Sequence, residues 1–146
     1  MNILVIQGPN LNLLGVRKPE VYGEETLDEI NSVIEAYATE RGVTVTFFQS
    51  NHEGAIIDKI HALLGPASDD PHDALIINPG AYAHYSIAIR DAIEAVDVPT
   101  IEVHLSDIKK REAFRAKSVI EDVCTAQISG LGMQSYLRAI DRLTES

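Results

Sequence analysis

Two histidines and one glutamate stand out as side chains that could move protons or bind a metal. Glu102 and His104 lie two residues apart in segment 99–105, which has the apolar character of a β-strand. Because alternate residues of a strand point to the same face, this carboxylate could orient the imidazole. His84 lies in a separate segment, and with the pair it would make a zinc set of two histidines and a carboxylate. The residue types therefore fit either proton transfer or metal-assisted chemistry.

Cations are concentrated at two places in a strongly acidic chain. The 146 residues carry a formal net charge of −10, but Arg17-Lys18 and the stretch 109–117 are basic. Binding to a phosphate backbone requires a concentrated excess of Lys and Arg, so we expect no nucleic-acid partner. We interpret Lys109, Lys110 and Lys117 as a solvated helix face. The other cations of the two clusters could bind a small anion.

The elements that must position these residues alternate between apolar strands and amphipathic helices. The expected strands are residues 3–7, 43–47, 74–78, 99–105 and 124–128. The expected helices begin at the T-x-x-E capping box of Thr26, near Ile56 (with Ile57, Ile60, Leu63 and Leu64), at Ser86 (with Ile87, Ile89, Ile93 and Val96) and at Met133. Residues 9–23 contain two prolines and are predicted to form a long loop or lid.

This alternation predicts an α/β fold in one domain spanning residues 1–146. Parallel strands need helical crossovers, so we expect a flavodoxin-like, doubly wound, five-stranded parallel sheet of order 2-1-3-4-5. Ligands of such sheets bind beyond the carboxyl ends of the strands, here at loops 8–23, 50–53, 78–86 and 104–115. The chain has no G-x-G-x-x-G, no phosphate-binding G-x-x-x-x-G-K-S/T, no G-x-S-x-G and no hydroxyl-rich flavin loop. We therefore expect no nucleotide or flavin cofactor.

Short motifs in the same loops resemble those of the type II 3-dehydroquinate dehydratases. The motifs are Gly8-Pro9-Asn10-Leu11-Asn12-Leu13-Leu14-Gly15, Arg17-Lys18-Pro19-Glu20-Val21-Tyr22-Gly23, Phe48-Gln49-Ser50-Asn51-His52-Glu53-Gly54, Asn78-Pro79-Gly80-Ala81-Tyr82-Ala83-His84, Ile89-Arg90-Asp91, Glu102-Val103-His104-Leu105-Ser106, Arg111-Glu112-Ala113-Phe114-Arg115 and Gly130-Leu131-Gly132. They follow the family's order and spacing and cover essentially the whole chain. The resemblance is therefore far more specific than any single motif.

The resemblance implies a cofactor-free hydro-lyase that converts 3-dehydroquinate to 3-dehydroshikimate through an enolate. Tyr22 would be the base, as a tyrosinate, with Arg17 as a nearby cation. Asn10 would hold a water against the enolate oxygen, and His104, oriented by Glu102, would be the general acid. An ordinary phenol has a pKa near 10, and positive charge would have to lower it by roughly two to three units.

The resemblance also implies a set of substrate-binding positions and an assembly. These positions are Asn78, His84, Asp91, Leu105, Ser106 and Arg115. The family contributes Asp91 from a neighbouring subunit, which implies a dodecamer built of trimers. The reaction serves either the shikimate pathway, which leads to chorismate and aromatic amino acids, or quinate breakdown. Departures from the family pattern at Lys18, Tyr85, Asp107 and Ala116-Lys117 would affect the lid and substrate affinity without removing a catalytic group.

Three alternative functions remain open from the residues themselves. The zinc set described above would support a metal-dependent lyase or hydrolase. Schiff-base chemistry would need a desolvated lysine, but all the lysines lie in polar or amphipathic segments. A binding or scaffold protein could keep the fold without the reaction, since fold does not fix function.

The remaining features of the sequence concern its environment. No segment resembles a signal peptide, and no apolar run approaches 18 residues, so we expect a soluble, cytoplasmic protein without a membrane partner. The single cysteine, Cys124, rules out an internal disulfide. Its neighbours predict a small core residue within the last strand rather than a reactive thiol.

Overall fold

The computed structural model describes residues 1–16, 18–64 and 71–145, with only the backbone of Pro19 and Tyr22. The strands are β1 (Asn2–Gln7), β2 (Thr44–Gln49), β3 (Ala74–Asn78), β4 (Thr100–His104) and β5 (Ala126–Ser129). The α-helices are α1 (Pro19–Tyr22), α2 (Leu27–Glu40), α3 (Glu53–His61), α4 (Ile87–Val96) and α5 (Gln134–Thr144). Short 3-10 turns are η1 (Leu11–Leu13), η2 (Gly80–His84), η3 (Ile108–Lys110), η4 (Ala113–Arg115) and η5 (Glu121–Val123).

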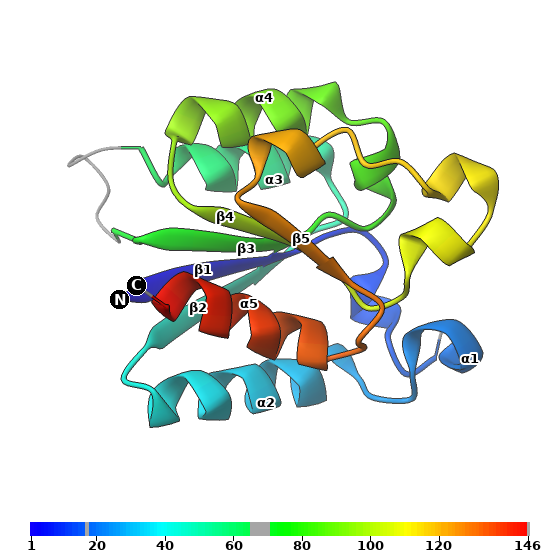
Figure 1. The fold of residues 1–146 in the computed structure, drawn as a ribbon, viewed down its shortest axis with the longest axis horizontal. Coiled ribbons are helices and arrows are strands. Elements are labelled where there is room, and N and C mark those ends of the chain that lie inside the picture. The colour runs from blue at the N-terminus through cyan, green and yellow to red at the C-terminus, as the bar shows by residue number, and fades with distance from the viewer. Residues whose placement is uncertain (17, 65–70, 146) are drawn as a thin grey trace.

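The five strands form one parallel sheet of order β2-β1-β3-β4-β5, which confirms the predicted flavodoxin-like topology. Helices α2 and α5 cover one face of the sheet, and α3 and α4 cover the other (Figure 1). Strand β1 shows why its sequence is wholly apolar. Ile3 and Val5 pack into the core under α2 and α5, while Leu4 and Ile6 pack into the core under α3 and α4.

The helix starts follow the predicted capping signals. The Thr26 side chain accepts a hydrogen bond from the Glu29 backbone N–H at 3.2 Å, and the Ser86 side chain accepts one from Ile89 at 3.1 Å. Among the described residues, no helix combines the length and apolar character needed to cross a membrane.

Some details of the predicted elements are wrong. The segment 9–23 contains the turn η1 and the helix α1, which begins at a proline, a favoured first helical residue. Ile87 was predicted on the apolar face of its helix but is 62% exposed. Residues two apart in an α-helix lie on opposite sides, and Ile89 faces the core. Leu64 is exposed as well, since α3 already ends at His61.

Candidate functional site

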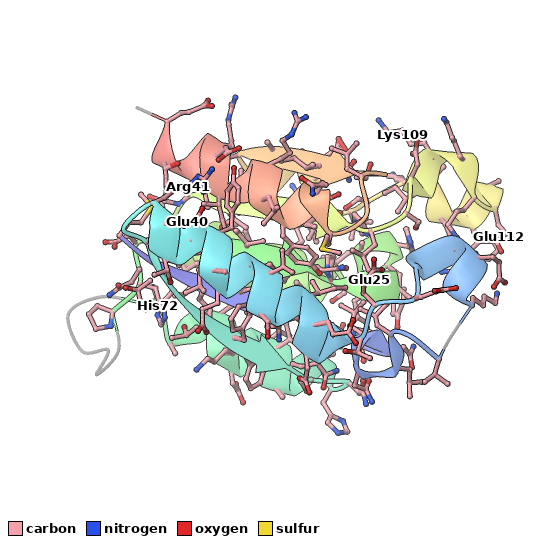
Figure 2. All side chains as sticks on the ribbon, turned by 90° about the horizontal axis from the view of Figure 1, so that it is seen from below. Glu25, Glu40, Arg41, His72, Lys109 and Glu112 are labelled. Atoms are coloured by element: carbon pink, nitrogen blue, oxygen red, sulfur yellow. The ribbon has the colours of Figure 1, made fainter. Side chains whose placement is uncertain are left out.

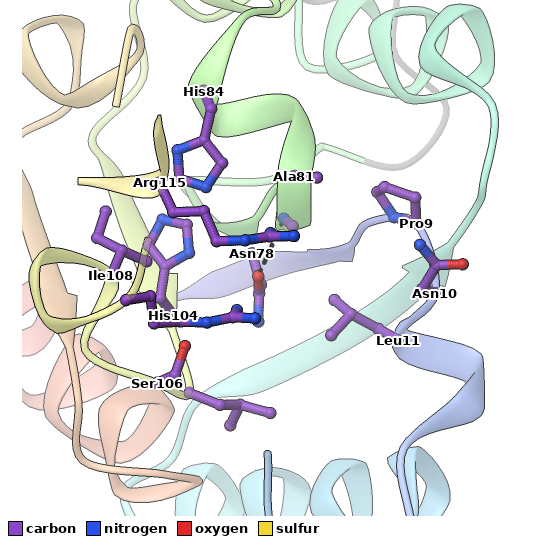
Figure 3. A pocket seen from close by; sticks show the side chains of 13 residues that line it. Pro9, Asn10, Leu11, Asn78, Ala81, His84, His104, Ser106, Ile108 and Arg115 are labelled. Carbon is purple, nitrogen blue, oxygen red and sulfur yellow. Dashed lines mark hydrogen bonds between the residues drawn. The ribbon is translucent and has the colours of Figure 1, made fainter. Parts of the chain in front are cut away.

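A cavity of about 190 Å³ opens at the carboxyl ends of β1, β3 and β4 (Figure 3). Drug-sized ligands usually occupy 300–1,000 Å³, so this cavity suits a smaller molecule. It is lined by Pro9, Asn10, Leu11, Asn78, Gly80, Ala81, His84, His104, Leu105, Ser106, Ile108, Arg111 and Arg115. Seven of the residues predicted for the site are among them: Asn10, Asn78, His84, His104, Leu105, Ser106 and Arg115.

The cavity lies where the order of the sheet reverses, between β1 and β3. The Gly8 N–H donates to the Asn78 carbonyl oxygen at 2.8 Å, which joins the two loops. A Cβ on Gly8 would lie 2.8 Å from the backbone carbon and oxygen of Pro79, so only glycine permits this approach. Gly8 therefore allows the loop after β1 to pack directly against the loop after β3, and residues of both loops line the cavity.

Asn10 lies at the rim of the cavity in a left-handed backbone conformation, with φ 68°. Asparagine tolerates this conformation better than most residues. Its backbone N–H donates to the Asn51 side-chain oxygen at 3.0 Å, which ties the first loop to the loop after β2. Figure 3 shows Leu11 pointing into the cavity, while the exposed Asn10 amide turns away from His104.

His104 and Glu102 form the buried pair that their spacing predicts. The Nε2 of His104 lies 2.5 Å from Glu102 Oε2, with the histidine 5% exposed and the glutamate fully buried. Glu102 lies beneath His104 and does not line the cavity. Its second oxygen, Oε1, has no hydrogen-bond partner within the described part of the chain. The carboxylate therefore binds Nε2 of the imidazole, and Nδ1 can bind a group in the cavity.

His84 stacks beside His104, with ring centroids 6.4 Å apart and planes inclined by 21°. Its Nδ1 lies 2.8 Å from the Lys117 carbonyl oxygen, which fixes the ring in the cavity wall. Over residues 1–16, 18–64 and 71–145, no three His, Cys, Asp or Glu side chains are arranged to hold a metal ion. This side-chain geometry does not support the zinc set of His84, His104 and Glu102.

Two arginines bring positive charge to the cavity. Arg115 was predicted, whereas Arg111 was not included among the site residues although it lies in the basic stretch. Arg115 Nε lies 2.9 Å from Glu112 Oε2, and Arg111 Nε lies 3.9 Å from the same oxygen. The pKa of the Glu112 carboxyl is lowered. The larger cause is a hydrogen bond from the Glu112 backbone, and the smaller one is the positive charge of Arg115 and Arg111.

The lysines of the same stretch point to solvent, as predicted, but they do not share a helix face, because Lys109 and Lys110 lie in η3 and Lys117 follows η4. Lys109, Lys110 and Lys117 are exposed, and Figure 2 shows Lys109 projecting from the surface. Arg111 follows η3 and Arg115 ends η4, and both arginines line the cavity. Among the residues that the structure describes, no lysine lines the cavity, so Schiff-base chemistry has no candidate there.

Three other predicted site residues are not brought together by the described structure. Arg17 lies outside the described residues, and so does the Tyr22 side chain, although the backbone of Tyr22 ends α1. Helix α1 lies on the side of the molecule where the strands have their carboxyl ends (Figure 1). Asp91 is exposed on α4 and does not line the cavity of its own chain.

Three of the positions that depart from the family pattern lie outside the cavity. Asp107 caps η3 by accepting a hydrogen bond from the Lys109 N–H at 3.0 Å, a bond that asparagine could also accept. Tyr85 is 63% exposed, and Lys18 adopts φ 40° just before α1. None of these three side chains lines the cavity.

Cys124 is partly buried outside the cavity, two residues before β5 rather than within it. Burial, followed by the negative charges of Glu102, Glu121 and Asp122, raises the pKa of this thiol to about 12. At pH 8 we expect the folded protein to react with iodoacetamide about a thousandfold more slowly than the chain unfolded in guanidinium, because the reactive thiolate is scarce. Mass spectrometry of both samples over time would measure the difference, and equal rates would contradict it.

Comparison with known proteins places these features in a family context. The family model "Dehydroquinase class II" matches residues 1–144. The 3-dehydroquinate dehydratase of Caldicellulosiruptor bescii is 57% identical over 143 residues, which are 98% of this chain and 96% of that protein. The corresponding enzyme of Thermotoga neapolitana is 53% identical over 141 residues, covering 97% and 92% of the two chains.

Solved structures agree with the sequence comparison. The type II dehydroquinase of Butyrivibrio crossotus superposes with a TM-score of 0.94 at 48% identity, covering 99% of this chain and 98% of that one. The type II dehydroquinase of Propionibacterium acnes gives a TM-score of 0.90 at 40% identity, covering 97% and 94%.

Proposed function

Because the chain belongs to the class II dehydroquinase family, we propose that it dehydrates 3-dehydroquinate with Tyr22 as the base and His104 as the general acid. Family membership makes the chain a hydro-lyase of the 3-dehydroquinate dehydratase type. The observation that carries the residue roles is the buried Glu102–His104 pair beside a small cavity that holds two arginines.

The reaction requires two proton transfers in opposite directions. The tyrosinate of Tyr22 takes a proton from the carbon beside the ketone, and the electron pair moves to the ketone oxygen to form an enolate. The enolate then re-forms the carbonyl and expels the hydroxyl group, which takes a proton from His104 and leaves as water. Transfer of a proton from the Tyr22 phenol to His104, through solvent, restores both groups.

Positive charge in the cavity supports the proposed first step. A phenol acts as a base near neutral pH only where cations lower its pKa. The guanidinium groups of Arg111 and Arg115 line the cavity, and Arg17 precedes Tyr22 by five residues. We assign all three to this electrostatic role, and Arg115 also to the binding of an anionic substrate.

The Glu102–His104 pair supports the second step. A carboxylate 2.5 Å from the imidazole fixes the orientation of the ring, as a general acid requires. Asn10 is assigned to hold a water against the enolate oxygen. For this role, the Asn10 amide has to turn inward from the orientation that Figure 3 shows.

Substrate binding is assigned to polar groups around the cavity. Asn78 and His84 face it from β3 and η2, while Leu105 and Ser106 follow β4. Backbone N–H groups of Leu105 and Ser106 suit the substrate carboxylate, since they carry no competing negative charge. Segment 16–23 is assigned as a lid that excludes water from the enolate.

Asp91 is assigned to the active site of a neighbouring subunit in a trimer-based dodecamer. Its exposed position on α4, outside its own cavity, is what this assignment requires. Mixing Tyr22→Phe subunits with Asp91→Ala subunits by co-refolding is expected to restore about one quarter of the active sites, because each site borrows one residue from one neighbour. Steady-state rates would measure the recovery, and light scattering would measure the assembly.

A matched mixture tests whether that recovery comes from shared sites. Tyr22→Phe subunits mixed with the Tyr22→Phe/Asp91→Ala double variant contain no intact base and should stay inactive. If the mixture of single variants also stays inactive, while wild-type subunits recover full activity after the same treatment, Asp91 does not act across subunits.

The proposed reaction is tested by mixing the purified protein with 3-dehydroquinate in excess chelator and following the ultraviolet absorbance of the conjugated enone. Growth of this absorbance at an undiminished rate is expected, because no step uses a metal. Activity that is lost with chelator and restored by zinc would support the metal-dependent alternative. Tight binding of the substrate without turnover would support the non-catalytic one.

A further inference from the structure

A tyrosine outside the cavity is bonded to one of the residues that line it. Tyr136 on α5 is fully buried, and its hydroxyl accepts a hydrogen bond from Asn78 Nδ2 at 2.9 Å. The same hydroxyl donates to Gln7 Oε1 at 2.5 Å. Gln7 in turn donates from Nε2 to Asn31 Oδ1 on α2 at 3.3 Å. A chain of polar groups thus runs from α2 through the core to the edge of the cavity.

The surrounding bonds fix the direction of every hydrogen bond in this chain. Asn78 Oδ1 accepts from the Gly80 N–H at 3.2 Å, so the amide cannot flip without losing that bond. Its Nδ2 is therefore the donor to Tyr136, and the hydroxyl proton of Tyr136 goes to Gln7. Burial raises the pKa of the Tyr136 phenol, so the hydroxyl keeps this proton at any working pH.

These hydrogen-bonded side chains lie at the ends of the two strands that flank the binding site. Gln7 and Asn78 are register partners at the ends of β1 and β3, which flank the switch point of the sheet. The Tyr136 hydroxyl bridges their two side chains. An asparagine amide has two N–H donors. With one of them held by Tyr136, the other is the donor that Asn78 can offer to a ligand.

We infer that Tyr136 is a positioning residue whose hydroxyl holds the Asn78 amide so that an N–H, rather than the oxygen, meets an oxygen atom of the bound substrate. This inference rests on the proposed function, because it assigns Asn78 to substrate binding. Without the hydroxyl, only the 3.2 Å bond from the Gly80 N–H restrains the amide. An amide that rotates would turn its oxygen toward the substrate, where it would repel a carboxylate oxygen. Tyr136 acts through Asn78 and does not touch the substrate.

Replacing Tyr136 with Phe removes only the hydroxyl from this arrangement. The KM for 3-dehydroquinate is expected to rise about tenfold, as for the loss of one well-placed hydrogen bond, while kcat changes less than about twofold. Tyr37→Phe is the matched control, because its hydroxyl also bonds within the protein, to Asp141 at 2.7 Å, but far from the cavity residues. The control variant should keep the wild-type KM.

A double-variant cycle separates positioning from general loss of stability. Asn78→Ala should raise KM by itself, and adding Tyr136→Phe to it should raise KM no further, because Tyr136 has nothing left to position. A wild-type KM in folded Tyr136→Phe, or independent effects in the double variant, would overturn the inference. Activity of the wild-type protein on 3-dehydroquinate tests the proposed function separately from either result.

A second variant keeps the test available if Tyr136→Phe does not fold. Gln7→Met has a similar length and removes the acceptor of the Tyr136 proton, while Gln7 does not line the cavity. It should raise KM in the same direction, because the hydroxyl loses the bond that orients it. An unchanged KM in folded Gln7→Met would contradict the inference.

Discussion

Tyr22→Phe is expected to lower kcat for 3-dehydroquinate by two to four orders of magnitude, while substrate affinity changes by less than about threefold. The phenylalanine keeps the ring but cannot accept the proton from carbon, so the variant loses a contribution made only in the transition state. Enone absorbance would measure kcat, and isothermal titration of the variant with substrate would measure affinity.

Tyr85→Phe is the matched control for this experiment. Tyr85 is 63% exposed and does not line the cavity, so its loss of a hydroxyl should leave kcat within about twofold of wild type. If Tyr22→Phe retains near-normal turnover, Tyr22 is not the base. If it loses substrate binding and turnover together, Tyr22 acts in binding rather than in the proton transfer.

His104→Ala is expected to lower kcat by a factor of about 10² to 10⁴, because the leaving hydroxyl no longer receives a proton. The same change leaves the Glu102 carboxylate fully buried without its imidazole partner. Breaking such a buried pair lowers the free energy of unfolding, here by about 3 kcal/mol. Denaturant unfolding and enone absorbance would measure the two effects separately.

The double variant Glu102→Gln/His104→Ala separates catalysis from stability. A neutral amide removes the unpaired buried charge, so the free energy of unfolding should return toward the wild-type value while kcat stays low. His61→Ala, at an exposed position on α3, is the control and should change neither quantity appreciably. Recovery of kcat together with stability would show that His104 is structural rather than a general acid.

Local pattern was sufficient to predict the sheet. The apolar runs at Ile3–Gln7 and Ala74–Asn78 could be recognised because both faces of a central parallel strand are buried. The order of the strands followed from the alternation with helices, because parallel crossovers are restricted in length and hand. The placement of Glu102 and His104 on one face followed from the two-residue period of a strand.

The family motifs were sufficient to find most of the cavity. Ten of its lining residues lie in motifs at the ends of β1, β3 and β4, which a parallel sheet brings to one edge. Arg111 was missed because the charge pattern of a basic stretch does not say which cations face inward. Only the turns η3 and η4 direct Arg111 and Arg115 to the cavity and the neighbouring lysines to solvent.

The contact between Tyr136 and the switch point could be decided only by tertiary structure. In the sequence, Tyr136 fits an ordinary apolar position of the last helix, 129 residues from Gln7 and 58 from Asn78. Periodicity along a helix or strand reports which face is buried, since it depends on neighbours a few residues apart. Which polar groups meet inside that buried face depends on how helices pack on the sheet, and that is a property of the folded chain alone.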